Sequence, residues 1–61
     1  MDIGDIVRKK TSLGYKYGEV IGRGHFTSHH WMIRYENDVI EESAYILEVV
    51  LQRSKWLNKR R

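Results

Sequence analysis

Short apolar runs separated by turn residues occupy the first 50 positions of the chain. Apolar and polar residues alternate in IVRKK at 6–10, in YGEVIGRG at 17–24 and in WMIRYE at 31–36. A fourth run, VIEES, follows Asn37-Asp38, a pair of residues typical of tight turns. Alternating runs of this length, with turn signals between them, predict a meander of antiparallel strands that each bury one face.

The alternation also predicts which side chains face the core. Trp31, Ile33 and Tyr35 share one face of the third run, and Val7 lies opposite its neighbours in the first. A small domain needs bulky side chains to fill its interior, so we expect Trp31 in the core. The segments 11–16 and 25–30 are poor in aliphatic residues and are expected to be loops.

Two interpretations compete for the segment after Ser43. Apolar residues at helical spacing, with Ser43 as the N-cap, would continue as a helix. The β-prone residues Ile46, Val49 and Val50 instead favour a short turn at 44–46 and then a strand to about Val50. We predict the turn and strand.

Together these features predict an all-β fold, a small barrel of about five strands with a basic C-terminal tail or short helix. Gly18, Gly22 and Gly24 frame the second run, and glycine beside a strand marks the sharp bends that barrel closure needs. We place the barrel at residues 1–50 and the basic tail at 51–61.

Charge divides at the same boundary. The net charge of +3 combines six basic and eight acidic residues in 1–50, net −2, with five basic residues and no acid in 51–61, net +5. Such a tail is attracted to phosphates or to an acidic partner; the alternative is a solvated end. The candidate nucleic-acid contacts are Arg8, Lys10, Arg53, Lys55, Lys59, Arg60 and Arg61.

Composition removes several classes of protein. There is no cysteine, so disulfides, thiolate metal sites and cysteine nucleophiles are excluded. No apolar run is long enough to cross a bilayer, and the N-terminus lacks a signal-peptide layout. We therefore expect a cytoplasmic protein without a membrane partner.

The polar clusters do not form a recognisable catalytic or metal site. His29 and His30 are adjacent, so on a strand they point to opposite faces and do not share an ion easily; a polar loop or a pH-sensitive contact is the alternative. Glu41 and Glu42 also face opposite ways, which we interpret as solvation or protection of an exposed edge strand. We predict no enzyme activity, no metal and no cofactor.

Aromatic residues are dense for so short a chain. Tyr15, Tyr17 and Phe26 lie in or beside the expected loops, and Trp56 lies in the tail. These four are the candidates for an exposed aromatic surface that would contact peptides or bases.

The stretches GDIVRKK at 4–10 and YGEVIG at 17–22 resemble the opening strands of SH3-like and Tudor-like barrels. Among these barrels they are most similar to that of the plasmid-borne type II dihydrofolate reductases, with a weaker similarity at Ala44 to Glu48. The resemblance implies a small barrel and allows oligomerisation. It does not imply the activity, because the family's Val-Gln-Ile-Tyr segment is Val39, Ile40, Glu41 and Glu42 here. Two carboxylates would repel an anionic cofactor and an anionic substrate.

These observations predict a small non-enzymatic binding module that contacts DNA or RNA through its basic tail and first strand. The alternative is a protein-interaction or self-assembling adaptor, as a homo-oligomer or with another protein. The resemblance to the reductases also suggests that such an adaptor would be encoded by a phage or mobile element.

Overall fold

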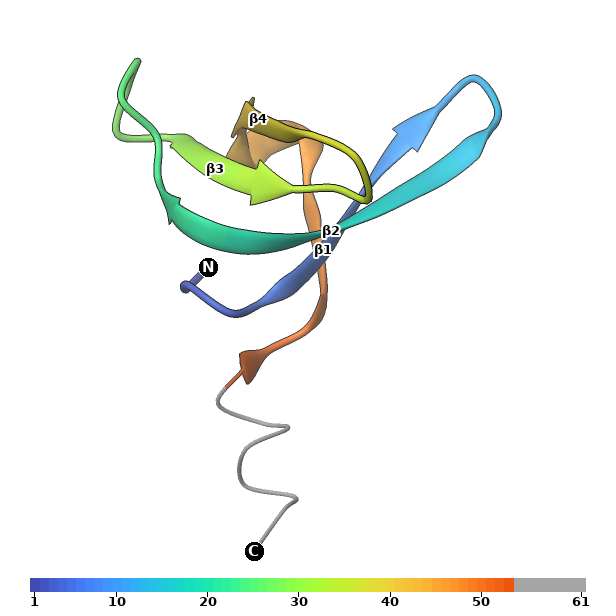
Figure 1. Ribbon diagram of the computed structural model, residues 1–61, viewed down its shortest axis with the longest axis horizontal. Helices are drawn as coiled ribbons and strands as arrows, with labels where there is room; N and C mark the ends of the chain where they lie inside the picture. The colour runs from blue at the N-terminus through green and yellow to red at the C-terminus, as the bar shows by residue number, and fades with distance from the viewer. Residues whose placement is uncertain (54–61) are drawn as a thin grey trace, which may run out of the picture.

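A computed structural model describes residues 1–53 and shows one antiparallel sheet of five strands (Figure 1). The strands are β1 (Ile6–Thr11), β2 (Gly14–Arg23), β3 (His30–Arg34), β4 (Val39–Ser43) and β5 (Glu48–Leu51). A single turn of 3-10 helix, η1 (Ala44–Ile46), separates β4 from β5. The order across the sheet is β4-β3-β2-β1-β5, so β5 returns to the far side of β1.

The long strand β2 bends the sheet around the core. Its first part pairs with β1, from Gly14 opposite Thr11 to Glu19 opposite Ile6, and its second part pairs with β3. The register with β3 shifts between Val20 and Gly22, which is a bulge that sharpens the bend. Within residues 1–53 the sheet is open, with β4 and β5 as its edges.

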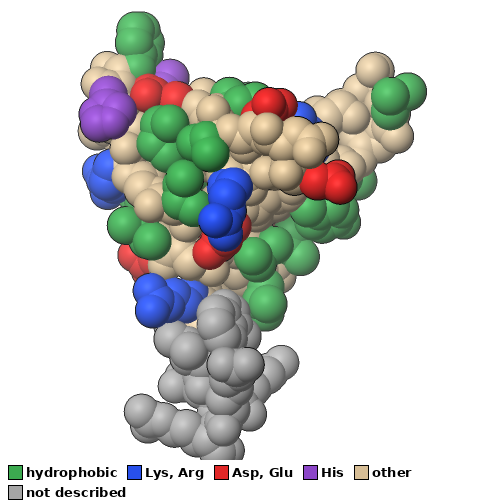
Figure 2. Space-filling model, in the orientation of Figure 1, with side chains coloured by type: hydrophobic (Ala, Val, Ile, Leu, Met, Phe, Trp, Pro, Cys, Tyr) green, Lys and Arg blue, Asp and Glu red, His purple; other side chains and the backbone are tan. Residues whose placement is uncertain are grey.

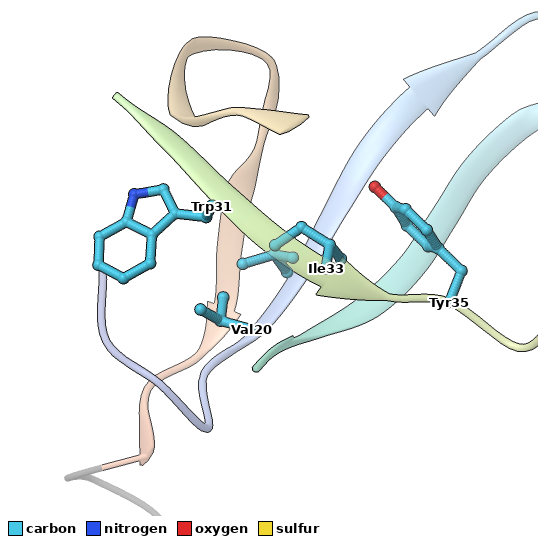
Figure 3. Close-up of a cluster of buried hydrophobic side chains, with 5 residues drawn as sticks. Val20, Trp31, Ile33 and Tyr35 are labelled. Carbon is cyan, nitrogen blue, oxygen red and sulfur yellow. The ribbon is translucent and has the colours of Figure 1, made fainter. Parts of the chain in front are cut away.

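The core consists of Val7, Val20, Trp31, Ile33 and Tyr35. Figure 3 shows Trp31, Ile33 and Tyr35 in a row along and just beyond β3, with Val20 of the neighbouring strand against them. Gly18 permits this packing, because a Cβ atom there would lie only 2.6 Å from the Ile33 side chain and 2.9 Å from the Tyr35 ring. The predicted core face of the third run, with Trp31 inside, is confirmed.

Most predicted elements are confirmed, including the all-β class and the turn and strand after Ser43. The Ser43 side chain accepts a hydrogen bond from the Tyr45 amide and so caps η1. Asn37 and Asp38 form the predicted turn, in which the Tyr35 amide donates to the Asp38 carbonyl at 2.7 Å.

Three boundaries differ from the prediction. The first loop is only Ser12-Leu13, because Thr11 accepts from the Leu13 amide and Gly14 adopts a φ of +123°, which closes a tight turn. Tyr15 therefore belongs to β2 and not to a loop. His30 begins β3, and Leu51 ends β5 although we assigned it to the tail.

No helix in the described part of the chain is long and apolar enough to cross a membrane.

Candidate nucleic-acid interface

The β1–β2 hairpin extends beyond the rest of the sheet (Figure 1). Strand β5 pairs with β1 only from Ile6 to Arg8, and β3 pairs with β2 only from Glu19 onwards. Residues from Lys9 to Lys16 therefore lie in a two-stranded ribbon whose strands pair only with each other among the described residues. Neither edge of this ribbon pairs with a third strand among the described residues, so both edges are open to a partner.

The hairpin carries cations and no acid. Residues 6–18 contain Arg8, Lys9, Lys10 and Lys16 but no Asp or Glu. The side chains alternate between the two faces, so Arg8 and Lys10 lie on the outer face, while Lys9 and its cross-strand partner Lys16 lie on the inner face. The alternation of β1 thus separates Lys9 from Arg8 and Lys10.

The outer face combines these cations with two tyrosines. Tyr17 lies opposite Arg8 and Tyr15 lies opposite Lys10, and their exposed fractions are 53% and 50%. The Arg8 guanidinium stacks on the Tyr15 ring, 4.0 Å from its centroid. Both tyrosines are surface residues as predicted. They lie in a strand, however, and the strand geometry fixes the distance between the two side chains and the direction in which they point.

Arg8 is held by a carboxylate from β5. Its Nε and Nη2 atoms donate to the two Glu48 oxygens, both at 3.1 Å. The Tyr17 side chain and then Glu48 raise the pKa of Arg8 above its usual value. The pair positions the guanidinium over Tyr15, but it also neutralises part of the charge that we assigned to the first strand.

A shallow hollow of about 390 Å³ lies beside Tyr17, between β1, β2 and the end of β3. Ile6, Gly18 and Tyr35 contribute to its apolar lining. Glu19, Arg34 and Glu36 also line it, and Arg34 donates to Glu19 at 2.5 Å. The lining of the hollow therefore contains both an aromatic side chain and charged side chains.

On the inner face, a polar cluster links the hairpin to β4. Lys9 and the Tyr35 hydroxyl both donate to Glu42, the latter at 2.7 Å. The Lys16 ammonium lies 4.6 Å from the Tyr35 ring centroid. Burial raises the pKa of Tyr35, and the Glu42 carboxylate raises it further. For Glu42, burial alone would raise the pKa, but the hydrogen bonds from Lys9 and Tyr35 outweigh it and the pKa is lowered.

Glu41 and Glu42 lie on β4, an edge strand, as expected, but their carboxylates bind donors of the chain and do not merely solvate the strand. The Glu42 side chain is only 10% exposed and accepts the two bonds of the inner cluster. Glu41 accepts from the amides of His25 at 3.0 Å and Phe26 at 2.8 Å, which lower its pKa, and its carboxylate lies 2.9 Å from His30 Nδ1. The alternation of the sequence correctly places Glu41 and Glu42 on opposite faces of β4. It does not show which hydrogen-bond donors from other segments reach each carboxylate.

Phe26 is 80% exposed at the loop between β2 and β3, as predicted for a surface residue. Its ring lies 5.2 Å from that of His30, and not beside the hairpin tyrosines. Figure 2 shows hydrophobic side chains at the tip of the β1–β2 hairpin and at the tip of the loop between β2 and β3. Lys and Arg side chains are scattered over the body of the molecule between these two tips. The four aromatic candidates therefore do not form one surface: only Tyr15 and Tyr17 share a face, and Trp56 lies outside the described residues.

Of the five tail cations, only Arg53 is within the described residues. Its backbone amide donates to the buried Asp5 carboxylate at 2.8 Å, and its side chain packs against Gly4. Lys55, Lys59, Arg60 and Arg61 lie outside the described residues. The start of the tail is thus fixed against the base of β1.

The histidines are separated by their different contacts. His29 stacks with Tyr45, at 5.1 Å between ring centroids, whereas His30 contacts Glu41. Among residues 1–53, no group of three His, Cys, Asp or Glu side chains is arranged to hold a metal ion.

Searches for similar proteins found no matching family model, no matching curated protein and no matching solved structure. The function therefore has to be argued from the hairpin and its surroundings.

Proposed function

We propose that this chain is a small non-enzymatic module, on an SH3-like scaffold, that binds nucleic acid through the β1–β2 hairpin and the basic residues after β5. The observation that carries the proposal is the β1–β2 hairpin, whose residues 6–18 contain four cations, two half-exposed tyrosines and no acid, and whose two-stranded ribbon projects from the sheet. Cations supply the attraction to phosphates, and exposed aromatic rings supply contacts to bases.

The acidic residues of the domain compete less with a phosphate chain than their number suggests. Five of the eight acids bind donors of the chain itself: Asp5, Glu19, Glu41, Glu42 and Glu48. By contrast Lys10, Lys16 and Arg23 form no ion pair with another residue in 1–53. The cations that remain available therefore include two on the hairpin.

The test is a titration of the full chain with labelled oligonucleotides, followed by fluorescence anisotropy at about 50 mM and about 200 mM salt. We expect binding that weakens steeply with salt, because phosphate contacts release counterions. A variant with Gln at Lys55, Lys59, Arg60 and Arg61 should bind more weakly and with a shallower salt dependence. Absence of binding at the lower salt, or binding indifferent to salt, contradicts the proposal.

A second function, protein interaction or self-assembly, is supported by exposed apolar surface. Among residues 1–53, eleven large hydrophobic residues are at least 38% exposed, against five hydrophobic residues in the core. Phe26 and Tyr45, both 80% exposed, are the best placed for a protein partner because they belong to the β2–β3 loop and to η1 and not to the hairpin. Light scattering of the full chain over a range of concentrations tests self-assembly. A monomer throughout contradicts it, whereas an oligomer lost in a Phe26→Ser, Tyr45→Ser double variant supports it.

A further inference from the structure

The outer face of the hairpin and the hollow beside Tyr17 form one continuous surface, and we infer that it binds single-stranded nucleic acid, with an unpaired base seated in the hollow against Tyr17. This inference rests on the proposed nucleic-acid function and specifies the form of the ligand.

The two tyrosines are spaced to contact successive bases of an extended strand. Tyr15 and Tyr17 are two residues apart on β2, so they point to the same side about 7 Å apart. Each is about half exposed, which leaves ring surface available for stacking. Stacking on aromatic rings needs bases whose faces are uncovered, and a duplex covers those faces with the neighbouring base pairs.

Charge on this surface separates a phosphate side from a base side. Lys10, which forms no ion pair within residues 1–53, lies across from Tyr15 on β1 and attracts phosphates, whereas Arg8, across from Tyr17, is already paired with Glu48. Glu19 and Glu36 line the hollow beyond Tyr17 and repel phosphates. Carboxylates accept hydrogen bonds, and the amino groups on the edges of bases donate them. A strand lying across the surface would thus direct its backbone to β1 and a base into the hollow.

The hollow itself suits a base better than an apolar segment. It is open and shallow, about 390 Å³, with Ile6 and Tyr17 supplying apolar lining for a flat ring. Glu36 also lines it and accepts none of the hydrogen bonds found within residues 1–53, so an apolar side chain filling the hollow would take this carboxylate out of water without a hydrogen-bonding partner. A base stacks on the ring and still offers donors to the carboxylates.

The experiment compares single-stranded and duplex DNA of one sequence with the full chain at the same low salt. We expect the single strand to bind more tightly. Tyr17→Leu should weaken single-strand binding roughly tenfold, since stacking contributes about 1–3 kcal/mol per base, and should have a smaller effect on the duplex. Tyr17→Phe, which keeps the ring, should bind nearly as wild type. Tyr45→Leu is the matched control, because Tyr45 is exposed but lies outside this surface.

Each outcome has a distinct meaning. If the wild-type chain binds neither DNA, the proposed function fails. If it binds the duplex as tightly as the single strand, or if Tyr17→Leu behaves as Tyr45→Leu does, only the single-strand inference is overturned. Should Tyr17→Leu prove unfolded by circular dichroism, the comparison of the two DNA forms on the wild-type chain and a Tyr15→Leu variant still decide the matter.

Discussion

The carboxylate of Asp5 accepts a hydrogen bond from the backbone amide of Arg53, 48 residues later in the chain, at 2.8 Å. Its other oxygen accepts from the Asp2 amide, also at 2.8 Å, and the residue is only 3% exposed. One buried carboxylate therefore joins the N-terminal turn, the start of β1 and the chain that leaves β5. It fixes where the basic tail begins.

Replacing Asp5 should destabilise the fold. In Asp5→Asn, an amide nitrogen replaces one acceptor oxygen and leaves one backbone amide without a partner. A buried group left in that state costs about 1–3 kcal/mol. The measurement is the free energy of unfolding from urea denaturation. Asp2→Asn is the control, since Asp2 is exposed, and it should change stability by about 0.5 kcal/mol or less. Equal stability of the two variants would show that the Asp5 bonds contribute nothing.

Gly18 and Gly22 provide a matched pair on one strand. A Cβ atom at Gly18 would lie 2.6 Å from Ile33 Cγ2, whereas at Gly22 nothing lies within 4 Å. Gly18→Ala should therefore destabilise by about 1–3 kcal/mol through overpacking of the core. Gly22→Ala should be close to neutral. Thermal unfolding followed by circular dichroism distinguishes them, and a Gly18→Ala melting temperature at or above that of Gly22→Ala contradicts the packing seen here.

The inner cluster should make stability depend on pH in the acid range. The folded pKa of Glu42 is lowered below its usual value, because the hydrogen bonds from Lys9 and Tyr35 outweigh burial. A glutamate in an unfolded chain titrates near about 4.3. The stabilisation is thus fully present above that pH and is lost as the pH falls through the folded pKa. Melting temperatures measured from neutral pH down to about pH 3 should decline below about pH 5.

Glu42→Gln separates this contribution from those of other acids. The variant cannot ionise at this position, so its melting temperature should be lower than wild type at neutral pH and should fall less on acidification. Glu36→Gln is the control, because Glu36 is exposed and accepts none of the hydrogen bonds found within residues 1–53. An acid dependence in Glu42→Gln as steep as in wild type would assign the effect to other groups, such as Glu41, whose pKa is also lowered.

Alternation and turn chemistry were enough to predict most of the fold. The core positions of Trp31 and Ile33 follow from period-two spacing, and β-branched residues favoured a strand ending near Val50. The last residue of β5, Leu51, was missed because its pairing with Ile6 depends on a register shift between β1 and β5, in which Val50 is passed over, and the sequence of one strand does not reveal such a shift. The short first turn was missed because it depends on the Thr11 side chain.

The candidate site was less predictable than the fold. Sequence reasoning identified the two cations and the two tyrosines of the hairpin separately. It does not indicate that each tyrosine of β2 lies directly opposite one of these cations of β1. That follows from the register, which places Tyr17 opposite Arg8. Nor does the sequence show that Glu48, from the opposite edge of β1, binds Arg8, because their contact spans 40 residues.

The last prediction concerns the hairpin lysines that form no ion pair within residues 1–53. If Lys10 and Lys16 contact phosphates, Lys10→Gln and Lys16→Gln should each weaken binding to all nucleic acids. Each should also reduce the slope of log affinity against log salt by about 1. Arg34→Gln is the matched control, because Arg34 is already paired with Glu19 at 2.5 Å and should change the slope less. Equal slopes in wild type and both lysine variants, with binding retained, would move the phosphate contacts from the hairpin to the residues after β5.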